Sequence, residues 1–400
     1  MSRLTARRLS ARMENFAPFR VVEVMEKAWE VQARGRSVVH LAVGEPDFGT
    51  PAAVVEAAGR AIAEGRVHYT SSVGIPALRE AISDHYGEHF GVDVPVSRIV
   101  VTAGASAALV LAFGITLDAG DEVILSDPGY PCNRNLIRLY GADPVGASVG
   151  PDDNYQLSID TVAPRWTDRT RGVLIGTPSN PTGTVVAAED LAELVRWTTS
   201  RGGLSFVDEV YGELVYDGDP STALGCSSDI FVINSFSKTF GMTGWRLGWL
   251  VCPDWATEAA NRLAQNLYIS PPVPAQFGAL AAFTPAVRAI VDERRRLFRE
   301  RRELLVDGLR RLGFGVPVTP QGAFYVYARC DRFATDSSEF VRRLLDEAGV
   351  AVVPGDDFGA FEAERHVRFS YAASLEQLHE ALARLEAFTE RCRTDLRTGS

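Results

Sequence analysis

The sequence is poor in cysteine, with five among 400 residues. Their number is odd, their spacing is wide and no C-x-x-C pair occurs. A disulfide framework or a zinc ribbon needs paired or closely spaced cysteines, so neither is predicted. This usage favours a reducing compartment, and we expect a cytoplasmic protein. The cysteines are Cys132, Cys226, Cys252, Cys330 and Cys392.

Long apolar runs and an excess of basic residues are also missing. The longest apolar run, about Ala105 to Leu117, is shorter than the ~20 helical residues that cross a bilayer. No apolar stretch follows the N-terminal arginines, so no secretory signal is predicted. Forty-one basic residues stand against 51 acidic ones, a formal net charge of −10. We therefore expect neither nucleic acid nor a membrane as a main partner.

What the chain does contain is an ordinary globular composition, with 46% apolar and 23% charged residues. Its length suggests roughly two to three domains. From about residue 98, short β-branched runs alternate with helical stretches, which is typical of a mostly parallel sheet covered by helices. The expected strands are Ile99–Thr102, Glu122–Leu125, Gly172–Ile175, Leu204–Val207, Ile230–Ile233 and Leu247–Val251.

The pattern changes after about residue 285. An arginine-rich helix over about 286–312 precedes strands near 323–328, 350–353 and 366–370 and a final helix from about 375. No linker rich in Pro, Gly or Ser separates this part from the rest, so we expect a smaller α+β domain packed against the sheet. Further helices are expected at 21–34, 52–64, 76–89, 105–117, 131–140 and 188–201, with a short strand at Val38–Leu41.

Lys238 gives the strongest chemical signal in the sequence. It lies in Ser235-Phe-Ser237-Lys238, directly after the buried strand that ends at Asn234. A lysine just past a buried strand, among small hydroxylated residues, favours a Schiff-base lysine whose amine is desolvated and nucleophilic. Arg246, eight residues later, is suited to gripping a phosphate. A solvated surface lysine is the simpler alternative.

Three more segments end strands of the expected sheet. Ser179-Asn180-Pro-Thr-Gly183 follows one strand, Asp208 ends another, and the loop of Gly104, Ala105 and Ser106 lies between a strand and a helix. An acid at such a strand end faces the crevice where parallel sheets bind ligands. Small residues before a helix expose N–H groups to a phosphate. Taken singly, the segment from Ser179 to Gly183 is explained equally well as a turn, and Asp208 as a helix or loop cap. The loop of Gly104, Ala105 and Ser106 alone is weak evidence of a phosphate site.

Together these residues fit the needs of a pyridoxal phosphate enzyme. Such an enzyme requires a lysine for the aldehyde and an anion that keeps the pyridine nitrogen protonated. It also requires a phosphate cradle, donors for the ring oxygen and an aromatic ring to stack on. The candidates are Lys238, Asp208, the Gly104–Ser106 loop with Ser235, Ser237 and Arg246, Asn180 with Tyr211, and Tyr130.

These motifs, in this order, resemble the class I/II aminotransferases of fold type I, the aspartate aminotransferase superfamily. The matching segments are V-G-E-P-D-F (43–48), H-Y-T-S-S-V-G-I-P-A-L-R (68–79), D-P-G-Y-P (127–131), S-N-P-T-G, V-D-E-V-Y (207–211), S-F-S-K-T-F-G-M-T-G-W-R (235–246) and V-R-F-S-Y-A (367–372). The resemblance covers about residues 15–390. It implies a large, mostly parallel α/β/α domain at 51–284 and a small α+β domain at 285–400, joined by the N-terminal segment 1–50.

The resemblance also implies roles for single residues. Lys238 would hold the aldehyde and move the proton between the substrate Cα and the cofactor C4′. Asp208 would pair with the ring nitrogen, while Asn180 and Tyr211 would bond the ring oxygen. Tyr130 matches the stacking position, where many relatives have Trp or Phe. Tyr69 matches the tyrosine that reaches the phosphate in the neighbouring subunit, which implies a homodimer with shared sites.

The substrate carboxylate is assigned in the same way. Arg368 matches the arginine that binds it, with the Gly44 backbone nearby; an exposed position on an alternating strand is the alternative from the residues alone. Ser106 occupies the position where bacterial aspartate-specific relatives carry a lysine for the second carboxylate. The segments Ala17-Pro-Phe19 and Asn266–Ile269 are apolar or aromatic. We therefore expect a neutral or aromatic L-amino acid as donor and 2-oxoglutarate or pyruvate as the usual acceptor, in ping-pong exchange through pyridoxamine phosphate.

Other functions stay open at this point. Another Cα reaction on the same cofactor, such as that of a C–S lyase, uses the same cofactor motifs. A pyridoxal-phosphate-binding transcription regulator would need a DNA-binding module, for which the segment before residue 15 leaves no room. His85-x-x-Glu88-His89 fits an inverted zincin pattern and Ser235-x-x-Lys238 that of a serine acyl-enzyme, but both patterns are short. We expect no metal. The arginine run at 294–302 is expected to form a solvated, salt-bridged helix face.

Overall fold

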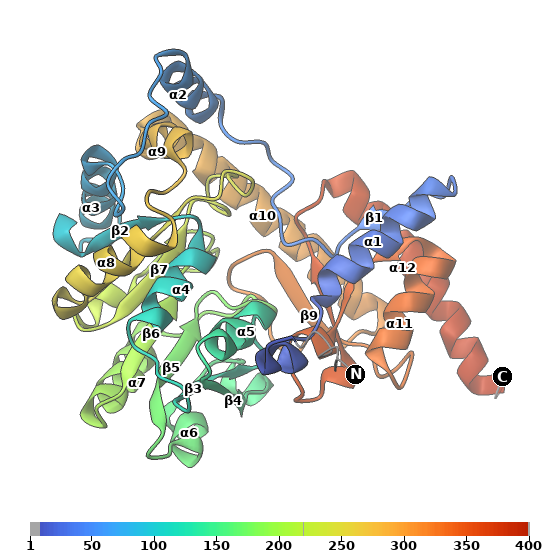
Figure 1. The fold of residues 1–400 in the computed structure, drawn as a ribbon. Coiled ribbons are helices and arrows are strands. Elements are labelled where there is room, and N and C mark those ends of the chain that lie inside the picture. The colour runs from blue at the N-terminus through green and yellow to red at the C-terminus, as the bar shows by residue number, and fades with distance from the viewer. Residues whose placement is uncertain (1–8, 219, 399–400) are drawn as a thin grey trace, which may run out of the picture.

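The computed structural model describes residues 9–218 and 220–398. Arg3, Arg7 and Arg8 lie outside them. A seven-stranded sheet forms the larger part of the molecule (Figure 1). β8 runs antiparallel to its two neighbours, and all other neighbouring strands are parallel. In spatial order the strands are β2 (Ile99–Thr102), β8 (Gly248–Val251), β7 (Phe231–Ser235), β6 (Leu204–Asp208), β5 (Thr170–Gly176), β3 (Glu122–Asp127) and β4 (Asp143–Ser148).

Two hydrophobic cores cover the two faces of this sheet. Successive strand residues alternate between them, as Ile124 and Leu125 of β3 do, because side chains of a strand point to opposite faces. Helices α4 (Ala105–Gly114), α5 (Pro131–Leu139) and α8 (Thr257–Leu267) pack on one face. The other face carries α3 (Pro76–Phe90) and α7 (Ala188–Ser200), with α2 (Ala52–Ala63) and α9 (Val273–Ala279) in the same core.

A second region combines segments from the N-terminal and C-terminal parts of the described chain (Figure 1). Its antiparallel sheet has the order β11 (Val353–Pro354), β12 (His366–Ser370) and β9 (Tyr325–Arg329). β1 (Val39–His40) pairs in parallel with β10 (Val350–Ala351). Helices α1 (Arg20–Ala33), α10 (Pro285–Leu312), α11 (Ser337–Arg343) and α12 (Leu375–Thr398) complete it. The predicted fold class is confirmed, while the boundaries at 50/51 and 284/285 stay predictions.

Some elements differ from the sequence predictions. The edge strand β4 was not predicted, because its sequence contains Pro144 and Gly146 and it is half exposed. The single strand expected at 350–353 is wrong: β10 pairs with β1, and β11 pairs with β12. Among the described residues, no helix has both the length and the apolar character needed to cross a membrane.

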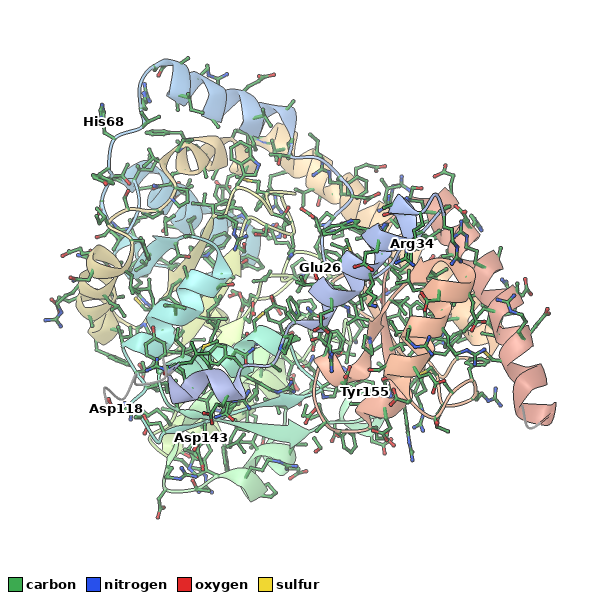
Figure 2. All side chains as sticks on the ribbon, turned by 45° about the vertical axis from the view of Figure 1, so that its right-hand side comes forward. Glu26, Arg34, His68, Asp118, Asp143 and Tyr155 are labelled. Atoms are coloured by element: carbon green, nitrogen blue, oxygen red, sulfur yellow. The ribbon has the colours of Figure 1, made fainter. Side chains whose placement is uncertain are left out.

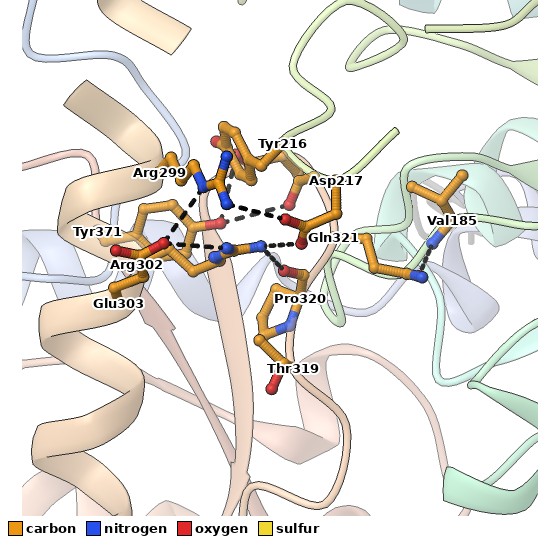
Figure 3. Close-up of polar contacts among 12 residues, drawn as sticks. Val185, Tyr216, Asp217, Arg299, Arg302, Glu303, Thr319, Pro320, Gln321 and Tyr371 are labelled. Atoms are coloured by element: carbon orange, nitrogen blue, oxygen red, sulfur yellow. Dashed lines mark hydrogen bonds and ion pairs between the residues drawn. The ribbon is translucent and has the colours of Figure 1, made fainter. Parts of the chain in front are cut away.

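The arginine-rich helix α10 is not simply a solvated face. Arg301 and Arg302 are 6% and 4% exposed, so that part of the prediction is wrong. Arg301 binds both carboxylate oxygens of Asp47, at 2.7 and 2.9 Å. Arg302 donates to Asp217 and to the Pro320 carbonyl (Figure 3). The helix thus anchors the segment that leads from α1 toward α2 and the loop that leads into β9.

Candidate active site

A cavity of about 290 Å³ lies where the carboxyl ends of β5, β6 and β7 meet the loops that follow them. This is the position at which parallel sheets bind ligands. Most of the predicted site residues lie on its wall: Gly44, Ala105, Ser106, Tyr130, Asn180, Asp208, Tyr211, Ser235, Ser237, Lys238, Arg246 and Arg368.

Lys238 is partly buried, and its Nζ donates a 2.7 Å hydrogen bond to the carbonyl oxygen of Gly44. Burial lowers the pKa of the lysine to about 8, although Glu45 raises it. A larger fraction of the amine is therefore uncharged near neutral pH than in an exposed lysine. Such an amine is prepared to react with an aldehyde.

Asp208 ends β6 at the cavity wall, where its carboxylate accepts the Val210 N–H at 3.1 Å. Withdrawal from solvent raises its pKa to about 6, while that N–H and Lys238 lower it. Since no cation forms an ion pair with Asp208 among the described residues, the carboxylate suits a cationic ligand atom such as a protonated ring nitrogen.

One corner of the cavity is shaped for an anion. Gly104, with φ of +84°, leaves room for the Arg246 side chain, because a Cβ there would lie 2.6 Å from Nη2. Arg246 itself has a φ of +52°, an uncommon conformation for a residue other than glycine and one that concentrates at functional sites. The Oγ atoms of Ser235 and Ser237 lie 2.8 Å apart at the same wall. These groups and the N-terminus of α4 fit a phosphate.

Asn180 and Tyr211 are held by neighbours that the sequence prediction partly missed. Arg368 donates to Asn180 Oδ1 at 2.9 Å, which leaves the Asn180 amide group as a donor. The hydroxyl of Tyr211 lies 2.7 Å from that of Tyr325. Tyr325 was not predicted as a site residue, because an aromatic residue on a strand resembles ordinary core. Asn133 was also missed: it lines the cavity, is 6% exposed, and its Oδ1 has no hydrogen-bond partner within the described part of the chain.

Arg368 is 2% exposed, so the alternative of an exposed strand position is wrong. Its strand, β12, lies between β11 and β9 and is buried along its whole length. The guanidinium donates to the Ala42 carbonyl at 2.6 Å and lies over the rings of Tyr325 and Phe358, at 4.4 and 4.9 Å from their centroids. Its buried Nε has no hydrogen-bond partner among the residues that the structure describes. A planar carboxylate is the natural complement to this donor group.

The side of the cavity toward α1 is apolar. Phe19 and Val21 line it, and the Phe19 ring packs edge-on against Tyr130 at 6.1 Å. Within the described residues, the cations on the wall are Lys238, Arg246 and Arg368. Three other arginines lie off this wall: Arg134 beside Asp127 at 3.7 Å, Arg138 on the Asn15 carbonyl at 3.3 Å, and Arg262 on Glu258 at 3.1 Å.

Tyr69 is not on the cavity wall of its own chain. It is 79% exposed, and the preceding His68 lies at the outer edge of the molecule (Figure 2). Its expected contact with a neighbouring subunit stays a prediction.

The two short alternative motifs have other contacts. His85 and His89 stack at 5.2 Å beside the buried Glu213, with His85 Nε2 at 3.3 Å from the carboxylate. Glu88 is exposed. In the part of the chain that the structure describes, no group of three or more His, Cys, Asp or Glu side chains is arranged to hold a metal. Ser235 Oγ contacts Ser237, while Lys238 Nζ contacts Gly44.

Comparison with known proteins identifies the family. The family model for aminotransferase class I and II matches residues 36–385. The chain belongs to this family. It is an enzyme that transfers amino groups with pyridoxal phosphate, and the cavity's lysine, its carboxylate and the corner shaped for an anion fit that cofactor. Its substrates are small molecules.

The aminotransferase is similar over nearly its whole length to relatives of differing specificity. It is 40% identical over 370 residues to the valine–pyruvate aminotransferase of Mycobacterium tuberculosis, covering 92% of this chain and 95% of that one. It is 38% identical to the aspartate/prephenate aminotransferase of Thermus thermophilus, covering 94% and 98%. A solved aminotransferase from M. tuberculosis superposes with a TM-score of 0.93 at 38% identity, covering 96% of this chain and 100% of that chain.

Proposed function

We propose that this aminotransferase moves the amino group of a neutral or aromatic L-amino acid to a 2-oxo acid by a ping-pong mechanism. The apolar side of the cavity supports this donor class. Phe19, Val21 and Tyr130 line it, and none of them carries a charge that could pair with a carboxylate on the substrate side chain. The similarity to a valine–pyruvate aminotransferase points the same way and makes pyruvate the first acceptor to test.

The cofactor would be held by residues that the cavity brings together. Lys238 would take the aldehyde and Asp208 the ring nitrogen, while Asn180 and Tyr211 would donate to the ring oxygen. The phosphate would bind at Ala105 and Ser106, with Gly104 beside Arg246, and with Ser235 and Ser237, while Tyr130 would contact the ring face. When bound, pyridoxal phosphate supplies an aldehyde that receives the amino group and a ring that withdraws electrons from Cα.

The remaining chemistry belongs to the side chains. Arg368 would bind the substrate α-carboxylate beside Asn180 and the Gly44 backbone, and so fix which Cα bond is aligned for cleavage. Lys238 Nζ, with a pKa lowered to about 8 by burial, is suited to removing the Cα proton and returning it. Because donor and acceptor carboxylates would share Arg368, the first product must leave before the acceptor enters. This sharing is the structural reason for ping-pong exchange.

The enzyme is further proposed to be a cytoplasmic homodimer. Exposed Tyr69 supports the shared site, because its hydroxyl has no role within its own chain's cavity. Sedimentation of the holoenzyme and a Tyr69→Phe variant test this arrangement: the proposal expects a dimer in which the variant binds the cofactor more weakly.

Steady-state kinetics with matched donors test the proposed donor class. Valine, phenylalanine and aspartate are compared with pyruvate and with 2-oxoglutarate as acceptors. We expect kcat/KM for aspartate to be at least about tenfold below that of the better apolar donor, because its second carboxylate would be desolvated without a partner. Parallel double-reciprocal lines are expected for ping-pong exchange. A preference for aspartate would refute the donor class, and intersecting lines would refute the mechanism.

A further inference from the structure

The N-terminus of α1 lacks a cap within its own sequence. Phe19 stands at the N-cap position, where Ser, Thr, Asp or Asn usually accept the first free N–H groups, and no side chain of the helix does so. The first turn bonds Val22 and Glu23 back to the Phe19 carbonyl, which leaves the N–H groups of Arg20 and Val21 to be satisfied elsewhere.

Asp357 supplies this cap from the other end of the chain. Its Oδ1 accepts the Arg20 N–H at 2.9 Å, across 337 positions of sequence. Burial raises the pKa of Asp357 to about 6, and the N–H groups of Arg20 and Val21 lower it, as does Arg368. The carboxylate is therefore charged at neutral pH, in the place where a helix N-terminus favours a negative charge.

The two ends of this contact both lead to the cavity. Asp357 follows β11, and Val353 of β11 pairs with Arg368 of β12. At the other end, Phe19 and Val21 flank Arg20 and line the apolar side of the cavity. Residues 17 and 18, just before them, are exposed. The cap thus ties the apolar wall to the sheet that carries the carboxylate-binding arginine.

We propose that Asp357 is a positioning residue for substrate binding: its carboxylate holds the first turn of α1 so that Phe19 and Val21 cover the substrate side chain while Arg368 binds the carboxylate. The inference rests on the proposed neutral or aromatic donor. Asp357 itself is 7% exposed and does not line the cavity, so it acts on the substrate through these two residues.

The test compares two carboxylates that differ in their apolar tail. Propionate and 3-phenylpropionate are bound to the holoenzyme, with dissociation constants from calorimetry, for the wild type, Asp357→Asn and Asp356→Asn. Asp356 is the matched control because its neighbouring carboxylate pairs with the Arg20 side chain, at 3.5 Å, and accepts no backbone N–H from the described residues. We expect Asp357→Asn to weaken 3-phenylpropionate about fivefold, because asparagine keeps an acceptor for the Arg20 N–H but loses the negative charge that a helix N-terminus favours, and to weaken propionate less than about twofold. Asp356→Asn should change neither dissociation constant by more than about twofold.

Equal weakening of both ligands by Asp357→Asn would overturn the proposal, because the disturbance would then reach Arg368 and not the apolar wall. Unchanged binding of both would overturn it as well. Asp357→Glu keeps the proposal testable if Asp357→Asn does not fold: it keeps the charge but displaces it by one methylene, so it should also weaken 3-phenylpropionate more than propionate. In the double variant Asp357→Asn with Phe19→Ala, a fivefold loss of affinity for 3-phenylpropionate beyond that of Phe19→Ala alone would overturn the action of Asp357 through Phe19.

The wild type separates this inference from the proposed donor class. If the wild-type holoenzyme binds 3-phenylpropionate no more tightly than propionate, the donor class fails, whatever the variants do. If it prefers 3-phenylpropionate and Asp357→Asn keeps that preference in full, only the positioning role of Asp357 fails.

Discussion

Replacing Arg368 by lysine should weaken substrate binding far more than it disturbs the fold. Arginine has five N–H donors, and two of them bond Ala42 and Asn180 at 2.6 and 2.9 Å. Others, the unpartnered Nε–H among them, are left for a carboxylate. Lysine has three donors on one atom, so it cannot hold both neighbours and still make a two-pronged bond to the substrate.

The expected loss is at least one charge-assisted hydrogen bond, about 1.5–3 kcal/mol, which raises the amino-acid KM about 10- to 150-fold. The assay is kcat and KM for the best donor, with a spectroscopic titration of the holoenzyme as an independent measure of affinity. Arg134→Lys is the control, since Arg134 is also largely buried and bonds the Phe358 carbonyl, outside the cavity wall. An unchanged KM in Arg368→Lys, or an equal change in the control, would refute the assignment.

Three further outcomes follow from the cavity. The cofactor-free protein should bind pyridoxal phosphate covalently at a rate that rises with pH and levels off above about pH 8. The reason is that burial lowers the pKa of Lys238 to about 8 and only the uncharged amine reacts. Stopped-flow absorbance measures this rate, and a rate that keeps rising to pH 10 would contradict the prediction. Asp208→Asn should lower kcat at least about 100-fold with little change in melting temperature, since the ring nitrogen loses its anion; a retained kcat rules out that role. Tyr325→Phe removes the hydroxyl 2.7 Å from that of Tyr211, which would donate to Tyr211 while Tyr211 donates to the ring oxygen. Its loss should weaken the bond to the ring oxygen and raise the midpoint pH of the cofactor absorption change by about 0.5–1. A lower midpoint would contradict this direction and mean that Tyr211 donates to Tyr325 in the wild type.

Local patterns predicted the sheet and the polar residues at its strand ends, whereas Arg368 and Gly44 were assigned to the cavity only through the resemblance to the aminotransferases. Buried β-branched strands predict a parallel sheet, and polar residues at their carboxyl ends, such as Asp208 and Lys238, must then meet at one edge. The edge strand β4 was missed because it is half exposed and contains Pro144 and Gly146, so it lacks the apolar β-branched run that marks the buried strands.

Contacts between distant segments were beyond the reach of local patterns. Arg368 lies on an alternating strand that would have one exposed face in a two-layer sheet, but all five residues of β12 are buried, so both of its faces are covered. Tyr325 belongs to the site through its contacts with Tyr211 and Arg368, and the sequence spacing of these residues does not predict those contacts. The cap that Asp357 provides for α1 joins residues 337 positions apart.

The most direct test of the central claim is the absorption spectrum of the holoenzyme through one complete exchange. Valine is added without an acceptor, free valine and the 2-oxo acid product are removed, and pyruvate follows. The account predicts that the visible band of the cofactor–lysine linkage bleaches with valine, returns with pyruvate, and yields one alanine per site, while Lys238→Ala shows no such cycle. A band that persists with valine, phenylalanine and every other L-amino acid, or no band at all with added pyridoxal phosphate, would contradict it.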